Sequence, residues 1–493
     1  MEAAASVLGC TPAALRLLIG VLLGYPLAVV YRWYVHKLVP NAQHIFFTVT
    51  GLALIIFNYR WDSLHSLTNI VVVYVFMRMA GRTLAGLAAT FIFSLGYLLM
   101  GYLFTATDNY DIKWTMPHCI LCLRLIGVAF DYYDGGAKDL VNTVDSKLPP
   151  DLQATALDKV PSPLEMLGHS YYFGGCMVGP QFSMRRYQDF VQGTLWPSQK
   201  TEIANSVSYS MSRLIMGLIM MAFYQIGAIY VNDKVILSEE YLTQWSWCAR
   251  WLFLGLFGTI TLHKYVACWL MAEGSCALSG LSYNGRNAHG INQWNGLQNI
   301  WVWRFEMTTN FDGFIRAFNI NTNKWVAQYI YKRLKFLGNK NVSHIVALGF
   351  LALWHGFHMG YYICFLNEFL VMKFERDVSQ IIDSFPRVRN VVYHEKLQWL
   401  RLIFMKIYVA SLFGYCLVPF ILLKPYKFHQ VYASFYYVPS ILLAIWFFSS
   451  FQAMPLVKRM ARDSSNGLVN RDASIGNGGK IGSDDTKAQD KQD

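Results

Sequence analysis

Charged residues are scarce in this chain. Aspartate, glutamate, lysine and arginine make up 15% of its 493 residues. A soluble globular domain typically carries about 25%, so this shortfall argues against a soluble protein. Hydrophobic residues reach 54% of the chain. The two figures together predict a protein that is embedded in a membrane.

Cysteine motifs are also lacking, because the nine cysteines form no disulfide or metal framework. Cys119 and Cys122 make a C-x-x-C pair, but it lies in the apolar run C-I-L-C-L and no second pair follows at zinc spacing. We interpret these cysteines as packing residues.

No glycine-rich nucleotide motif or internal repeat is visible. No basic segment precedes the first apolar run, which argues against a cleaved signal peptide.

Long apolar stretches are what the chain does have. Crossing a bilayer takes about 20 apolar residues, and shorter stretches can re-enter it. The predicted fold class is all-α: a polytopic membrane protein of about ten transmembrane helices, with re-entrant and amphipathic helices. The expected spans are Leu15–Tyr31, His44–Phe57, Leu64–Met79, Leu84–Phe104, Pro117–Phe130, Val207–Tyr230, Cys248–Met271, His344–Phe369, Leu400–Leu423 and Tyr432–Phe451.

We expect a single membrane-embedded domain over residues 1–462 and a disordered polar tail over residues 463–493. The tail is rich in Ser, Gly, Asn, Asp and Lys and has almost no large apolar side chains. Such a segment cannot bury enough surface to fold. A second polar segment, Asp134–Ser162, contains two consecutive prolines. We expect it to form an exposed loop with a short helix at most.

The formal net charge is +12, and basic residues cluster in two segments, Lys324–Lys340 and Lys458–Arg462. In a membrane protein, the positive-inside rule accounts for them without nucleic acid and places them on the cytosolic side. A second interpretation stays open for Lys332 and Arg333, which can contact the phosphates of an anionic cytosolic substrate.

A histidine lies inside the apolar run Ile345–Phe369, in the segment A-L-W-H-G-F-H-M-G-Y-Y. Ionisable groups are costly within a bilayer, so His355 is a functional-site hypothesis by default. His358 follows three residues later, on what we expect to be the same helical face, and is predicted to line the same cavity. No carboxylate or third histidine stands at a matching spacing, so no metal site is predicted. Gly356 and Gly360 would let another helix approach closely.

Three asparagines, Asn319, Asn321 and Asn323, lie in a more polar stretch upstream of His355. Asparagine commonly caps helices and fills turns, so each residue alone is interpreted as structural. Their placement before an aromatic and basic segment, together with His355 further along the chain, gives them a second possible role.

These motifs carry a resemblance. The segments W-H-G-F-H-M-G-Y-Y, F-N-I-N-T-N-K-W-V-A-Q-Y and N-Y-D-I-K-W-T-M-P-H-C resemble the membrane-bound O-acyltransferase family, and within it the lysophospholipid acyltransferase branch. The likeness runs from about Leu15 to Pro455. It implies a catalytic pair of histidine and asparagine, which map onto His355 and Asn319, with Asn321 as the alternative asparagine.

The resemblance also implies an activity. A long, polyunsaturated acyl group would pass from acyl-CoA to the sn-2 hydroxyl of a lysophospholipid in the endoplasmic reticulum membrane. Lysophosphatidylcholine is the expected acceptor, with the ethanolamine and serine lysolipids beside it. Acyl-CoA is a co-substrate, and no bound cofactor is expected. The expected substrate-contacting residues are Trp354, His358, Tyr361, Asn321, Lys332 and Arg333.

Two alternatives remain open. The first is a different acceptor within the family: a sterol, a diacylglycerol or a protein. The second is a membrane transporter, a class in which inverted repeats with paired broken helices are common. We find no such pair in the sequence. Oligomeric state is left open.

Overall fold

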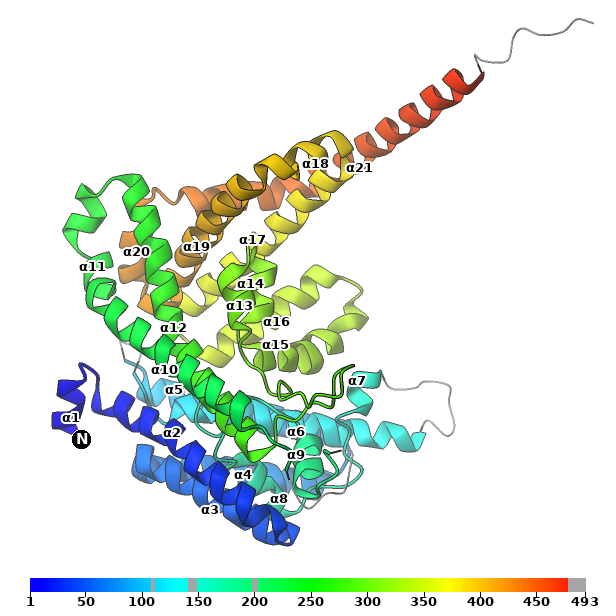
Figure 1. The fold of residues 1–493 in the computed structure, drawn as a ribbon. Coiled ribbons are helices and arrows are strands. Elements are labelled where there is room, and N and C mark those ends of the chain that lie inside the picture. Colours follow the sequence, from blue (N-terminus) through cyan, green and yellow to red (C-terminus); the bar gives the residue numbers. More distant parts are fainter. Residues whose placement is uncertain (108–110, 141–148, 197–202, 478–493) are drawn as a thin grey trace, which may run out of the picture. The chain divides into compact units, whose positions relative to one another are not determined.

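The computed structural model describes residues 1–107, 111–140, 149–196 and 203–477, and all regular elements in these residues are helices (Figure 1). The predicted all-α class is therefore confirmed. Short 3-10 and π-helical turns join the α-helices, among them η4 (Ala327–Tyr331) and η5 (Lys332–Leu337).

The described chain divides into two compact units, Met1–Phe369 with Ile403–Tyr437, and Leu370–Leu402 with Val438–Asp493. Helices α17 (Met359–Ser384) and α19 (Gln398–Leu422) each contribute to both units. The other helices of the first unit are α1 (Glu2–Val7), α2 (Pro12–Trp33), α3 (Pro40–Tyr59), α4 (Ser63–Ala80), α5 (Leu84–Thr105), α6 (Thr115–Leu140), α7 (Pro150–Gln153), α8 (Pro163–Ser170), α9 (Met184–Val191), α10 (Val207–Tyr230), α11 (Asp233–Ile236), α12 (Trp247–Ser279), α13 (Val302–Met307), α14 (Phe311–Ala317), α15 (Ile320–Val326), α16 (Lys340–His355) and α20 (Pro425–Ser434).

The second unit also contains α18 (Pro386–Val392) and α21 (Val438–Asn477). A buried ion pair lies within this unit: Lys373 on α17 contacts Asp377 one turn later at 2.6 Å. Ser450 on α21 accepts a hydrogen bond from the Lys373 ammonium, and the Trp446 indole donates one to the Asp377 carboxylate. The two buried charges are thus paired and hydrogen-bonded, as burial requires. The predicted disordered tail stays a prediction: α21 continues to Asn477, and residues 478–493 lie outside the described residues.

Seven segments of the described chain are long and apolar enough to cross a membrane. One of them, Pro40–Ala80, contains both α3 and α4. Two expected spans, Pro117–Phe130 and His344–Phe369, are not among the seven. The first lies on α6, whose buried residues include Arg124 and Asp131. The second is interrupted, because α16 ends after 16 residues at His355.

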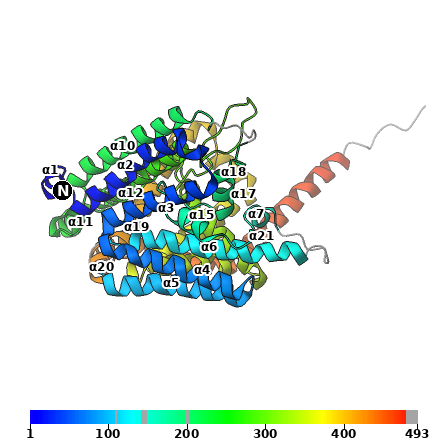
Figure 2. The same cartoon turned by 90° about the horizontal axis from the view of Figure 1, so that it is seen from below.

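Within the first unit, α12 packs against both α10 and α2 (Figures 1 and 2). Glycine allows the close approach. A Cβ atom on Gly217 of α10 would lie 2.7 Å from Met271 Cγ of α12. In the same unit, α5 packs beside α4 and α6, while α3 packs beside α8. Small residues at helix contacts are typical of packing in a membrane, where lipid offers no hydrophobic driving force between helices.

Two further glycine contacts bring α19 against its neighbours. A Cβ on Gly414 would lie 2.1 Å from the Leu254 carbonyl oxygen of α12. A Cβ on Gly360 of α17 would lie 1.9 Å from the Pro419 carbonyl oxygen of α19. The expectation that Gly360 lets another helix approach is thereby confirmed. Gly356 has another use, described with the site below.

The prediction of an exposed loop over Asp134–Ser162 was wrong at its start, while the short helix that it allowed is α7 (Pro150–Gln153). Helix α6 continues to Leu140, and Asp134 on it is buried. Leu152 and Leu157, beyond residues 141–148, which are not described, are also buried. The polar composition of this segment led to the wrong prediction, because the structure buries Asp134 in an ion pair with Arg333 of η5.

We predict that Gly414→Ala lowers the midpoint of thermal unfolding in detergent. Overpacking typically costs about 1–3 kcal/mol, more than the roughly 0.5–1 kcal/mol that alanine gains over glycine in a helix. The matched control is Gly96→Ala on α5, where a Cβ meets nothing within 4 Å. Its midpoint should stay equal or rise. Equal midpoints for both variants would contradict the close α12–α19 contact.

Candidate active site

His355 is the last residue of α16, and Gly356 ends that helix with φ of 126°. This conformation favours glycine, because a side chain there is strained. Helix α17 begins only at Met359. The sequence interpretation of one helical face carrying both histidines was therefore wrong: His358 lies in the break between the two helices. The break leaves the His355 side chain at a helix end.

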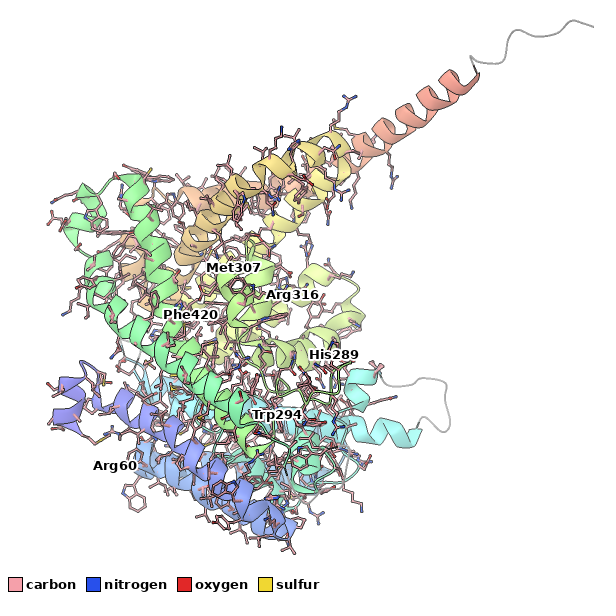
Figure 3. The ribbon with its side chains drawn as sticks, viewed as in Figure 1. Arg60, His289, Trp294, Met307, Arg316 and Phe420 are labelled. Atoms are coloured by element: carbon pink, nitrogen blue, oxygen red, sulfur yellow. The ribbon has the colours of Figure 1, made fainter. Side chains whose placement is uncertain are left out.

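Aromatic rings surround the His355 imidazole. Its ring centroid lies 5.4 Å from that of Tyr361 and 5.6 Å from that of Phe365, both on α17. Phe420 of α19, labelled in Figure 3, lies 5.0 Å away, edge-on. Among the described residues, none forms a hydrogen bond with the imidazole. Its nitrogens are therefore left for a substrate group in surroundings that are largely apolar.

Trp354 anchors the end of α16. Its indole N–H donates to the Cys119 carbonyl of α6 at 2.9 Å. Its own carbonyl accepts a hydrogen bond from the Tyr102 hydroxyl of α5 at 3.0 Å. These two bonds connect the residue next to His355 to two neighbouring helices. Trp354, which we predicted to contact the substrate, therefore forms structural hydrogen bonds within the protein. Tyr361 lies near both histidines, with its ring centroid 6.0 Å from that of His358.

The three asparagines have different surroundings. Asn321 is buried, and its side-chain amide donates to the Leu297 and Gln298 carbonyls at 3.1 Å each. The Asn323 amide donates to the Ile315 and Phe318 carbonyls at 2.9 Å each. Both amides hold the chain in place.

Asn319 differs from both. It precedes α15 in the left-handed conformation, with φ of 47°, which asparagine tolerates better than most residues. Its Oδ1 accepts a hydrogen bond from Asn299 Nδ2 at 3.3 Å. Its own Nδ2 has no partner among the described residues. Of the two asparagines that the resemblance offered, Asn319 is the one with a donor left for a substrate.

One apolar cluster borders both His355 and Asn319. Phe318, next to Asn319, and Phe420, next to His355, both pack against it. A cavity lies in the same region. Its lining combines apolar side chains with polar and charged ones: Leu262, Phe305, Phe314, Val409 and Phe413 with Thr259, Thr308, Glu306 and Lys406. The two predicted catalytic residues thus border a shared apolar region built from α12, α13, α14 and α19.

The predicted phosphate-binding cations have carboxylate partners inside the protein. Arg333 forms a bidentate contact with Asp134 of α6, and Lys332 pairs with Asp151 of α7. The hydrogen bond from the Lys332 ammonium holds the pKa of the Asp151 carboxyl below its ordinary value. Arg333 is fixed in a partly buried pair, while the Lys332 pair is more exposed.

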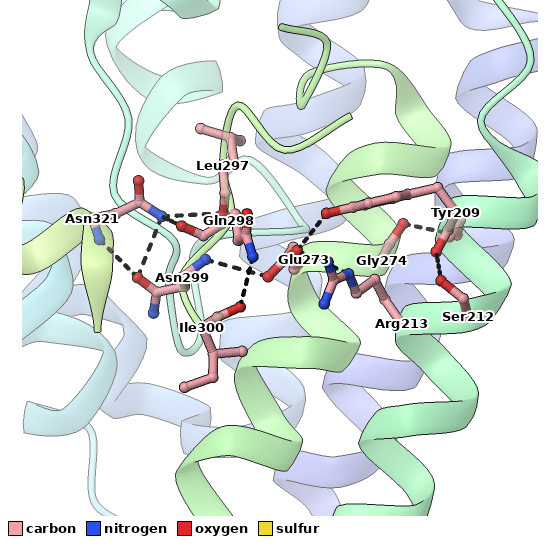
Figure 4. Close-up of polar contacts among 11 residues, drawn as sticks. Tyr209, Ser212, Arg213, Glu273, Gly274, Leu297, Gln298, Asn299, Ile300 and Asn321 are labelled. Atoms are coloured by element: carbon pink, nitrogen blue, oxygen red, sulfur yellow. Dashed lines mark hydrogen bonds and ion pairs between the residues drawn. The ribbon is translucent and has the colours of Figure 1, made fainter. Parts of the chain in front are cut away.

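Sequence reasoning missed Glu273 and Asn299, which hold the asparagine segment. The Glu273 carboxylate is fully buried on α12 and accepts a hydrogen bond from the Asn299 backbone N–H at 3.2 Å (Figure 4). A weaker signal was available: Glu273 lies two residues beyond the apolar stretch Cys248–Met271, where an ionisable group is also costly to bury. Asn299 carried no such signal.

Comparison with known proteins identifies the family. The model of the membrane-bound O-acyltransferase family matches residues 99–418, which include His355 and Asn319. The chain belongs to the membrane-bound O-acyltransferase family. With its seven candidate spans, it is a multi-pass membrane acyltransferase.

Similar proteins support the same placement. The chain is 42% identical over 434 residues to lysophospholipid acyltransferase 5 of Mus musculus, covering 88% of both chains. It is 36% identical over 482 residues to the protein of that name in Drosophila melanogaster, covering 96% of this chain and 93% of the relative. Membrane-bound glycerophospholipid O-acyltransferase 2 of Mus musculus is more distant, at 27% identity.

We predict that Trp354→Phe lowers kcat for acyl transfer by about tenfold to a hundredfold, because it would shift His355, the expected catalytic histidine, and small misplacements of a catalytic group are that costly. Loss of the Cys119 hydrogen bond should reduce stability by only about 1 kcal/mol. Trp303→Phe is the matched control, since the Trp303 side chain is 72% exposed. Steady-state rates of the two purified variants test this, and equal rates would contradict the anchoring role.

Proposed function

We propose that this chain is an acyl-CoA-dependent lysophospholipid acyltransferase of the endoplasmic reticulum membrane. The observation that carries the proposal is the pair of unpaired polar groups at one apolar region. The His355 imidazole lacks a hydrogen-bond partner among the described residues, and so does the Asn319 amide donor. Both side chains are only partly exposed, and polar groups in such surroundings usually have hydrogen-bond partners, so a ligand that pairs with them fits this arrangement.

In the proposed reaction, His355 is the general base. An imidazole nitrogen takes the proton of the lipid hydroxyl as its oxygen attacks the thioester carbonyl carbon. The carbonyl becomes an oxyanion, and the carbon–sulfur bond then breaks. The imidazolium returns its proton to the leaving thiolate, which departs as free coenzyme A. Histidine suits both steps because its ordinary pKa lies near neutrality. No acyl-enzyme is formed.

Asn319 is the proposed electrophilic partner. Its Nδ2 donates a hydrogen bond to the developing oxyanion or holds the acceptor hydroxyl. A single donor of this kind is typically worth about 3–4 kcal/mol. The aromatic rings around His355 exclude water, which strengthens this interaction and protects the thioester from hydrolysis.

The preferred acceptor is the sn-2 hydroxyl of lysophosphatidylcholine, with the ethanolamine and serine lysolipids also accepted, and the preferred acyl group is long and polyunsaturated. The names of the relatives support the lysophospholipid class. The apolar cluster against which Phe318 and Phe420 pack supports an acyl substrate. A sterol, diacylglycerol or protein acceptor is the remaining alternative.

We predict that His355→Gln lowers kcat about 10²- to 10⁴-fold, the usual contribution of a positioned base. The measurement is transfer of radiolabelled arachidonate from its CoA ester to lysophosphatidylcholine by purified protein in lipid nanodiscs. The matched control, His289→Gln, changes an exposed histidine (Figure 3) and should keep the wild-type rate.

Each outcome bears on a different part of the proposal. An active His355→Gln variant would remove His355 as the base. A wild-type protein that transfers arachidonate to another acceptor class, but to no lysophospholipid, would overturn the acceptor. A wild-type protein that transfers to none of these acceptors would overturn the enzymatic function and favour transport.

Lys332 and Arg333 provide a separate test of acyl-CoA binding. We predict that Lys332→Gln raises KM for acyl-CoA about threefold to tenfold while KM for the lysophospholipid is unchanged, because one charge contact with phosphate is lost. Arg316→Gln is the control, since the Arg316 side chain is 66% exposed and pairs with Asp312. An unchanged KM for acyl-CoA would contradict the contact and leave the Asp151 pair as the role of Lys332.

A further inference from the structure

The Asn319 side chain is oriented by a hydrogen-bonded relay that begins at a buried carboxylate on another helix. Glu273 of α12 is fully buried, and one of its oxygens is engaged by α10: the Tyr209 hydroxyl donates to it at 2.7 Å, and Arg213 forms an ion pair at 3.2 Å. The other oxygen accepts the Asn299 backbone N–H. Figure 4 shows these contacts converging on one carboxylate.

Asn299 is the second member of the relay, and all four of its polar groups are engaged. Its N–H binds Glu273, and its carbonyl accepts the Ile320 N–H at 2.9 Å. Its Oδ1 accepts the Asn321 backbone N–H at 3.0 Å. Its Nδ2 donates to Asn319 Oδ1 at 3.3 Å. Asn299 thus holds both the Asn319 side chain and the peptide that follows it.

The donors and acceptors in these hydrogen bonds determine which atom of the Asn299 and Asn319 side-chain amides is the oxygen and which is the nitrogen. A backbone N–H only donates, so the Asn299 atom facing Asn321 must be the oxygen. The remaining amide atom of Asn299 is then its nitrogen, which only donates. The Asn319 atom that meets it must therefore be its oxygen. The Asn319 nitrogen is left pointing away from Asn299.

We infer that Asn299 is a positioning residue that fixes which end of the Asn319 amide faces the substrate, with Glu273 holding Asn299 in place. This inference rests on the proposed role of Asn319. Without the relay, the Asn319 amide could rotate and present its oxygen, which repels an oxyanion. The buried Glu273 is then retained for orientation, a use of buried polar groups that goes beyond stability.

The test is a double-mutant cycle in the full chain, in lipid nanodiscs, with arachidonoyl-CoA and lysophosphatidylcholine. Asn299→Asp replaces the donor that faces Asn319 with an acceptor of nearly the same shape. Asn319→Gly removes the oriented amide and tolerates the left-handed backbone. Asn295→Asp is the matched control, because it makes the same change at an exposed site four residues earlier.

We expect Asn299→Asp to lower kcat about 10²-fold, as for loss of an oxyanion donor, with KM for both substrates changed by less than about twofold. In the Asn319→Gly background, the same substitution should change kcat by less than about twofold, because there is no amide left to orient. Asn295→Asp should keep the wild-type kcat. Unfolding midpoints are measured alongside.

Multiplying losses in the double variant would overturn the inference, as would an increase in KM with kcat retained. Should Asn299→Asp fail to fold, Asn299→Ala frees the Asn319 amide without adding charge. It should lower kcat about tenfold, and again only where Asn319 is present. If Asn319→Gly alone keeps full activity, the proposed role of Asn319 falls and the relay falls with it. If Asn319→Gly is impaired but the losses multiply, the relay alone is overturned.

Discussion

The buried carboxylate of Glu273 is the interaction on which the site depends. An unpaired charge inside an apolar helix bundle is strongly destabilising, so Glu273 must collect its partners as the protein folds. Two of them, Tyr209 and Arg213, come from α10, and the third is the backbone of Asn299. The polar connection after α12 is thereby bound to the helices. The position of the asparagine segment that follows is thereby fixed, including that of Asn319 with its left-handed backbone conformation.

His355 is positioned by a different means. Gly356 ends α16 in a conformation that other residues avoid, and Gly360 then allows α17 to touch the backbone of α19. The α19 contact also supplies Phe420, one of the rings around the imidazole. Gly356 therefore ends the helix beside His355, and Gly360 allows the contact with α19 that brings Phe420 near the imidazole. One half of the site is held by hydrogen bonds to a buried charge and the other half by close backbone packing.

Sequence alone predicted the all-α membrane fold and the family, because apolar length and local motifs are properties of contiguous residues. It failed where the partner is distant in the sequence. Asp134 was assigned to an exposed loop because of the polar composition of its segment, yet it binds Arg333, 199 residues away. The apolar run around His355 gave no sign of the helix break, since a single glycine causes it. The resemblance already favoured Asn319 over Asn321, but the difference in their hydrogen-bond partners is visible only in the folded chain.

The central claim is that His355 and Asn319 act as one unit on the same reacting group. A double-mutant cycle with His355→Gln and Asn319→Gly tests it most directly. Residues that act as a unit are strongly non-additive. The account therefore predicts that the double variant is slower than His355→Gln alone by less than about threefold. A double variant whose kcat falls by the product of the two single losses would show that the residues act independently and would contradict the account.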